Sequence, residues 1–205
     1  MPAAVAIGSV HGGLATPWRS LLIGGLALAL YLIAGPAPEL LVYDRTAIAA
    51  GEWWRLITGH WVHGDAGHAL WDIAALALFG ALFEGRLGRG IYWSLALGTV
   101  AIDAWLWWAM PELIRYCGLS GIINSLIAAG LWQTWRQTRD PLILWVGVAA
   151  VAKIGVEVAA GGALFTHTAW SSVPVVHAVG FVAGLPVVGL TAPRLDLRWF
   201  AGSQP

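Results

Sequence analysis

Residues 118–135 read GLSGIINSLIAAGLWQTW, a mostly apolar run that opens with a serine between two glycines. A transmembrane helix needs about 20 mostly apolar residues, so this run is close to the length of a bilayer span. Ser120 stands at its start, where a helix offers free backbone N–H groups and the positive end of its dipole. The stretch therefore predicts a membrane helix with a polar, reactive group near one membrane surface.

Five further apolar runs flank this one. The six predicted spans are Trp18–Ala34, His68–Phe83, Gly90–Met110, Gly118–Trp135, Pro141–Ala160 and Val173–Leu190. Charged residues interrupt the second span, at Asp72, and the fifth, at Lys153 and Glu157. The expected fold is an all-α, polytopic six-helix bundle with the fourth helix ringed by the others. We expect a single domain over residues 1–205, with its core at about 18–190.

The loop between the first two spans, Gly35–Gly67, is long for a connection without structure of its own. It carries Trp53, Trp54 and Trp61, and tryptophan is enriched at membrane–water interfaces. We expect this loop to be a folded interfacial element.

The composition fits a membrane protein. Hydrophobic residues make up 59% of the 205 residues and charged residues 11%, against roughly 25% charged in an average soluble domain. The net charge of zero gives no indication of a nucleic-acid partner, and the single cysteine, Cys117, excludes an internal disulfide. The first apolar run has no small-x-small cleavage site before a polar mature chain, so we interpret it as a retained helix.

The distribution of arginines predicts the orientation, because Lys and Arg are enriched in short cytoplasmic loops. With six spans, seven arginines fall on the side of the two termini and three on the other side. The seven are Arg19, Arg86, Arg89, Arg136, Arg139, Arg194 and Arg198, and the three are Arg45, Arg55 and Arg115. This predicts an integral membrane protein with both termini in the cytoplasm and the first loop outside.

Three reactive side chains are expected at a similar depth in the membrane. The second, fourth and sixth spans run in the same direction, and His68, Ser120 and His177 all lie near their starts. Polar groups inside a membrane usually mark function. A serine hydroxyl becomes a nucleophile when a base takes its proton, and histidine is suited to this near neutral pH. We therefore expect a Ser120–His177 dyad.

Glycines surround both members of the expected dyad. Gly118 and Gly121 flank Ser120 and permit unusual backbone angles, so that N–H groups can face a developing oxyanion. His177, Gly180 and Gly184 share one helical face, and small residues at this spacing let membrane helices approach closely. This face of the sixth span is expected to pack against the fourth.

Together, these motifs resemble those of the rhomboid family of intramembrane serine proteases. They occur in family order over about residues 51–190. The matching residues are Trp54 and Arg55; His63, His68 and Asp72; Glu84, Arg86 and Gly88; Gly118, Ser120 and Gly121; and His177, Gly180 and Gly184. The pair Tyr116-Cys117 before Gly118 also resembles the rhombosortase branch, which is thought to process exported bacterial proteins with a C-terminal Gly-Gly motif, an apolar helix and a basic tail.

The resemblance implies roles for these residues. Ser120 would be acylated, and His177 would act as base and then as acid for the leaving amine. His68 would help the Ser120 N–H to stabilise the oxyanion, and the backbone at Leu119 would form part of the same site. Trp54 and Arg55 would anchor the first loop. The expected substrate is a single-span membrane protein cleaved near the outer face, in a bacterial inner membrane. No cofactor or metal is expected, and the oligomeric state is left open.

One position departs from the family pattern, because Asp72 stands where an asparagine is usual. An asparagine donates a hydrogen bond to an oxyanion, whereas an ionised carboxylate repels it. Burial could keep Asp72 protonated and therefore a donor. Alternatively, Asp72 could be the partner of His68 or His177. The sequence leaves both alternatives open.

The remaining polar groups are given structural interpretations. Lys153 and Glu157, four residues apart, are expected to pair on one helix face, with a role in gating or in recognising a substrate tail as the alternative. Cys117 is expected to pack near the site, and Asp103 has no evident partner. Four potential ligands, His60, His63, His68 and Asp72, could suggest zinc, but their spacing has no H-E-x-x-H signature.

Two other kinds of protein are the main rivals. A non-catalytic rhomboid-like protein would bind membrane clients, although such proteins usually lack the serine or the histidine. A small transporter would use Asp72, Asp103, Lys153 and Glu157 as a polar path, and inverted repeats, which would support it, are not evident.

Overall fold

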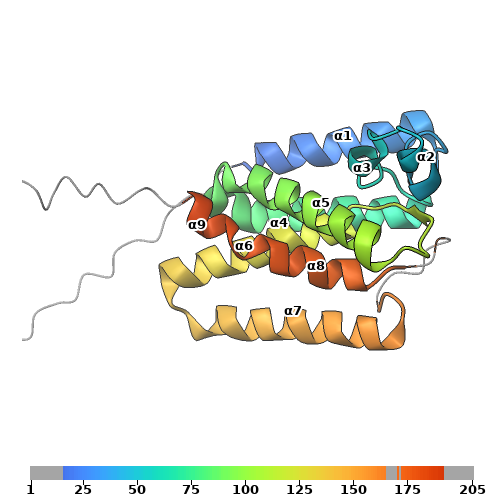
Figure 1. Cartoon of the computed structure of the whole chain (residues 1–205). Helices are drawn as coiled ribbons and strands as arrows, with labels where there is room; N and C mark the ends of the chain where they lie inside the picture. The colour runs from blue at the N-terminus through green and yellow to red at the C-terminus, as the bar shows by residue number, and fades with distance from the viewer. Residues whose placement is uncertain (1–15, 165–169, 171, 192–205) are drawn as a thin grey trace, which may run out of the picture.

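The computed structural model describes residues 16–164, 170 and 172–191, so Arg194 and Arg198 of the orientation argument lie outside the described residues. This part of the chain is almost entirely helical (Figure 1). In chain order, the elements are α1 (Trp18–Ala34), β1 (Tyr43–Asp44), α2 (Arg45–Ala49), α3 (Arg55–Thr58), α4 (Ala66–Leu87), α5 (Gly90–Ala109), β2 (Arg115–Tyr116), α6 (Ser120–Thr138), α7 (Pro141–Ala160), α8 (Val175–Gly184) and α9 (Val187–Thr191).

Helix α6 is the centre of the bundle. It packs against α4, α5, α7 and α8, while α1 packs mainly against α4 on the outside (Figure 1). About half of α6 is buried, including Ile122, Leu126 and Ala129. A helix enclosed on several sides needs small residues for close approach rather than a lipid-facing apolar surface. This explains why α6 is less hydrophobic than the helices around it.

Helix α7 contrasts with α6. It lies along one side of the bundle, where it contacts α6 and α8, and it buries only Ile154 and Glu157 of its 20 residues (Figure 1). Helices α4 and α7 are both long and apolar enough to cross a membrane.

The predicted spans agree with the observed helices except at the last one. The first and fifth spans coincide with α1 and α7. The predicted span Val173–Leu190 is instead two helices, α8 and α9, with the break at Leu185 and Pro186. Proline has no N–H for the helical ladder and clashes with the preceding turn, which accounts for the interruption.

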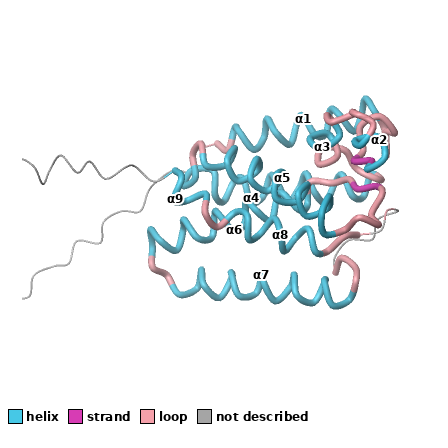
Figure 2. The backbone as a smooth tube through the Cα atoms, viewed as in Figure 1, coloured by secondary structure: helices cyan, strands magenta, loops and turns pink. Residues whose placement is uncertain are grey.

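The first loop is folded, as expected. Its short helices α2 and α3 and the two-stranded antiparallel pair β1–β2 gather at one end of the bundle, opposite the start of α1 and the end of α9 (Figure 2). The pairing of Tyr43 with Tyr116 ties this loop to the segment just before α6.

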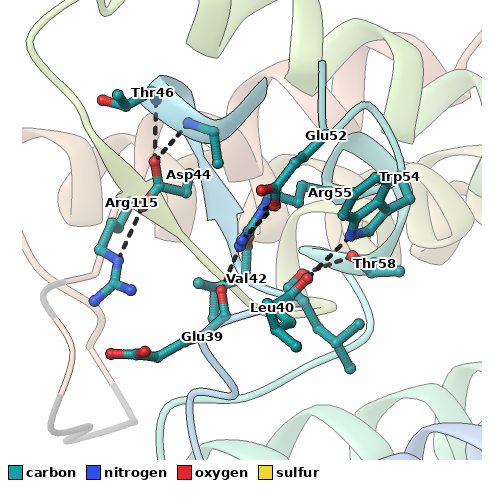
Figure 3. A network of polar contacts seen from close by, with 12 residues as sticks. Glu39, Leu40, Val42, Asp44, Thr46, Glu52, Trp54, Arg55, Thr58 and Arg115 are labelled. Atoms are coloured by element: carbon teal, nitrogen blue, oxygen red, sulfur yellow. Dashed lines mark hydrogen bonds and ion pairs between the residues drawn. The ribbon is translucent and has the colours of Figure 1, made fainter. Parts of the chain in front are cut away.

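Arg55 holds the first loop together (Figure 3). Its buried guanidinium donates to the backbone carbonyls of Glu39 and Val42 and pairs with Glu52 at 2.7 Å. Nearby, Trp54 Nε1 donates to the carbonyl of Leu40. The Trp54-Arg55 motif therefore fastens the loop through backbone acceptors.

At the other end of the bundle, Glu84 fastens α1. Its carboxylate accepts hydrogen bonds from the backbone N–H groups of Arg19 and Ser20 and from the Ser20 hydroxyl. These bonds satisfy N–H groups of the first turn of α1, which have no partner within the helix. Arg86 is exposed, and its guanidinium donates to the carbonyl of Leu82 on its own helix.

Candidate active site

Ser120 and His177 meet at the same level of the bundle. Ser120 is the first residue of α6, and His177 lies in the first turn of α8, which begins just after Pro174. The Nε2 atom of His177 lies 3.0 Å from the Ser120 hydroxyl oxygen. This distance is within the reach needed for a histidine to take the proton of a serine.

The glycines of α8 make this approach possible. A Cβ atom built on Gly180 would lie 2.0 Å from the carbonyl oxygen of Gly121, and one on Gly184 would lie 2.1 Å from that of Ser125. The face that carries His177, Gly180 and Gly184 therefore packs directly on the backbone of α6, as the spacing predicted.

Asp72 lies beside the serine rather than beside the base. Its Oδ2 atom accepts hydrogen bonds from the backbone N–H groups of Leu119, at 2.8 Å, and Ser120, at 3.1 Å. The same oxygen lies 3.3 Å from Nε2 of His63 and 3.4 Å from Nε2 of His68. The sequence left His68 and His177 as possible partners of Asp72. In the structure, Asp72 contacts His68, and His177 has another carboxylate as its partner.

Gly118 completes this corner of the site. Its φ of +123° is a conformation that residues with a side chain rarely adopt, and a Cβ there would lie 2.5 Å from His68 Nε2. Both the backbone angle and the lack of space beside His68 therefore require glycine at position 118. The histidine predicted to support the oxyanion lies against the loop that presents the serine.

The contact of Glu157 with His177 is the feature of the site that sequence reasoning missed. The expected Lys153–Glu157 pair is present, with Lys153 Nζ 2.7 Å from Glu157 Oε2. The same oxygen lies 3.0 Å from Nδ1 of His177. The only sequence signal was a glutamate inside an apolar span, because the i,i+4 spacing identifies the shared face of α7 but not the helix that this face meets.

Two other polar residues lie apart from the serine. Asp103, for which the sequence offered no partner, lies 3.1 Å from Nε2 of buried His60. This pairing separates His60 from the other potential zinc ligands, and the described residues contain no group of three His, Cys, Asp or Glu side chains arranged to hold a metal.

Cys117 is buried next to the site, and burial raises the pKa of its thiol to about 12.

A cavity of about 730 Å³ opens beside the serine, between α4 and α7 and over α6. Its polar lining includes His68, Asp72, Ser120, Lys153 and His177, and Glu157 also contributes. Trp71 and Leu82 on α4 and Val146 on α7 lie along its edges and are about half exposed on the outside of the bundle. The cavity therefore reaches from the serine to the apolar flank of the protein.

The sequence profile of the rhomboid domain matches residues 50–194, which cover α3 to α9 and every residue of the site described above. The chain belongs to the rhomboid family. This family consists mostly of intramembrane serine proteases, so the chain is an integral membrane protein of a helical-bundle class whose usual substrates are membrane proteins. Comparison with curated proteins gives no match.

Proposed function

We propose that this protein is an intramembrane serine endopeptidase with Ser120 as nucleophile and His177 as general base. The observation that carries the proposal is the 3.0 Å contact between His177 Nε2 and the Ser120 hydroxyl, at the wall of a cavity open to the apolar flank. Both residues also lie within the segment that matches the rhomboid domain.

The reaction follows from this contact. The Ser120 oxygen bonds to the carbonyl carbon of the substrate as its proton passes to His177 Nε2, and the carbonyl π electrons form the oxyanion. When the intermediate collapses, the C–N bond breaks and His177 returns the proton to the leaving amine. Water then hydrolyses the acyl-enzyme by the same steps, with His177 again acting as base.

The substrate proposed is a single-span membrane protein that enters from the lipid between α4 and α7. The cavity is mainly apolar, and its polar groups gather at the end that holds Ser120. A helix entering here must unwind for its backbone to reach the serine. Small residues at the cleavage point would assist, because glycine destabilises a helix and fits a narrow cleft.

We also propose that residues 1–205 form one domain with a core of about 18–190, crossing the membrane six times with both termini in the cytoplasm. The packing of α1 on α4 and the position of both described ends on one side of the bundle support this (Figure 1). In a Cys117→Ala background, Glu112→Cys is expected to react with a membrane-impermeant maleimide added outside, and Arg139→Cys is not. The reverse pattern would overturn the orientation.

The subfamily proposal is rhombosortase, and it rests on the resemblance around Tyr116-Cys117. In this proposal, the substrate carries a C-terminal Gly-Gly segment, an apolar helix and a basic tail, and the acyl-enzyme can pass the cleaved end to an amine instead of water. Co-expression with a protein bearing such a tail is expected to yield a shortened product. Retention of the full-length tail, with other membrane substrates cleaved, would exclude this branch.

A serine-directed fluorophosphonate probe tests the main proposal without a known substrate. The purified protein is expected to be labelled in detergent, whereas Ser120→Ala and His177→Ala are not. Ser125→Ala is the matched control, because Ser125 lies on the same helix but donates to the carbonyl of Ser94. Absence of labelling in the folded parent would count against the protease.

The client-binding alternative has one observation in its favour. The N–H groups of Leu119 and Ser120 that would receive an oxyanion are already bonded to Asp72. The transporter alternative is weaker, because Asp103 pairs with His60 and does not line the cavity that holds Asp72, Lys153 and Glu157. Failure of labelling together with retained binding of membrane clients would favour the first alternative.

A further inference from the structure

Both nitrogens of His177 have a defined partner. Nε2 faces the Ser120 hydroxyl at 3.0 Å, and Nδ1 faces Glu157 Oε2 at 3.0 Å. A carboxylate can only accept a hydrogen bond, so it selects the tautomer with the proton on Nδ1. This tautomer leaves the lone pair of Nε2 directed at the serine, which is the form a general base requires.

Glu157 itself is firmly held. Lys153 Nζ pairs with Oε2 at 2.7 Å, and the backbone N–H of Leu164 donates to Oε1 at 3.0 Å. The Glu157 side chain is 1% exposed, yet α7 buries only one other residue, Ile154. A helix that exposes most of its side chains thus directs its one acidic group inward to the base.

The other charged groups near the site have different partners. Asp72 on α4 contacts His63 and His68 and the backbone before α6, and the described part of the chain shows no hydrogen bond or ion pair between it and His177. Lys153 and His177 both contact Oε2 of Glu157, and the described residues show no direct hydrogen bond between the two. Glu157 is therefore the group placed to act on the imidazole.

We propose that Glu157 is the positioning residue of the site: its carboxylate orients His177 and balances the charge that the imidazole gains from the Ser120 proton. Lys153 keeps the carboxylate ionised and in place. The proton on Nδ1 stays on the histidine, and Glu157 remains an anion throughout. The inference rests on the proposed serine-protease function and extends its Ser–His pair to a Ser–His–Glu triad.

The test uses fluorophosphonate labelling of the full chain, resolved into probe affinity and the maximal rate of phosphonylation. Glu157→Gln is expected to lower the maximal rate about 10²–10⁴-fold, with probe affinity within about threefold of the parent. The reason is that the glutamine NH₂ can donate to Nδ1 of His177 and so favour the tautomer with its proton on Nε2, which cannot accept the Ser120 proton. Glu157→Ala leaves space beside the cavity, and added formate is expected to restore part of its rate. Formate should not restore Glu157→Gln, whose amide fills that space.

Glu84→Gln is the matched control, because Glu84 is an equally buried carboxylate that fastens α1 instead of the base. It is expected to lower the melting temperature and to leave the maximal rate within about twofold. If the Gln and Ala variants do not fold, Glu157→Asp draws the carboxylate back by one methylene and is expected to lower the rate about tenfold.

The outcomes separate this inference from the protease proposal. A labelled parent with a Glu157→Gln or Glu157→Asp variant of parental rate would overturn the role of Glu157 and leave the Ser120–His177 pair intact. A folded parent that is not labelled would overturn the protease itself, and with it the triad.

Discussion

The backbone N–H of Ser120 donates a hydrogen bond of 3.1 Å to Asp72 Oδ2. A serine protease uses this N–H to hold the oxyanion of its tetrahedral intermediate. Leu119 donates to the same carboxylate oxygen, so the donors nearest the nucleophile are occupied. Asp72 must therefore either yield this place to the substrate or carry a proton when the oxyanion forms.

Replacing Asp72 tests whether this carboxylate is ionised or protonated when the oxyanion forms. Because the carboxylate oxygen accepts from two N–H groups, we expect it to be ionised and to repel a developing oxyanion. Asp72→Asn removes the charge and adds an amide donor, so the maximal rate of phosphonylation is expected to rise about tenfold. Asp103→Asn, which removes a carboxylate on α5, should not change that rate. A slower Asp72→Asn variant would instead indicate that Asp72 works as a protonated donor or holds the backbone before α6.

The contact between α8 and α6 should be sensitive to a single methyl group. Gly180→Ala places a Cβ 2.0 Å from the Gly121 carbonyl oxygen, so α8 must move outward and carry His177 away from Ser120. Overpacking of this kind costs about 1–3 kcal/mol, and labelling is expected to fall more than tenfold. Gly155→Ala on α7 is the control, because among the described residues nothing outside its chain neighbours and the adjacent backbone of its own helix lies within 4 Å of its Cβ position. Equal melting temperatures and labelling for the two variants would contradict the packing.

The first loop should depend on Arg55 for stability. Arg55→Ala removes the donors to the carbonyls of Glu39 and Val42 and leaves Glu52 without its cation. Glu52 is 35% exposed, so the loss comes mainly from the buried hydrogen bonds of the guanidinium to the two carbonyls, about 1.5–3 kcal/mol. The thermal unfolding temperature in detergent is expected to drop by several degrees. Arg86→Ala is the control, because Arg86 is also an arginine of the rhomboid motifs but is exposed. It should change the free energy of unfolding by less than about 0.5 kcal/mol. A stable Arg55→Ala protein would show that the loop is fastened elsewhere.

Cys117 should be chemically inert in the folded protein despite lying three residues from Ser120. Burial raises the pKa of its thiol to about 12, so at pH 8 only about one thiol in 10⁴ is a thiolate. Iodoacetamide is expected to leave the folded chain unmodified at pH 8 and to alkylate it after denaturation. Cys117→Ala should keep the fluorophosphonate labelling of the parent. Rapid alkylation at pH 8 would mean that the thiol is accessible and ionised.

Local patterns were sufficient for much of the fold and part of the site. Apolar run lengths predicted the helices α1 and α7 to the residue, and the offsets of His177, Gly180 and Gly184 predicted the face that meets α6. These features depend on the helical period and on the lengths of the apolar runs, and both can be read from the chain alone. The break at Pro186 was missed although the proline is visible, because the apolar run continues across it.

Tertiary packing decided which polar groups meet. The sequence by itself determined that Lys153 and Glu157 share a face of one helix, and that Asp72 and Asp103 lie within apolar spans. It did not determine that Glu157 reaches His177, that Asp103 reaches His60, or that Asp72 accepts from the backbone at Ser120. A helical period specifies the direction of a side chain from its own axis, whereas its partner depends on which helix packs there and at what rotation. The close packing of α6 against its neighbours fixes which helices are adjacent and how each is rotated about its axis.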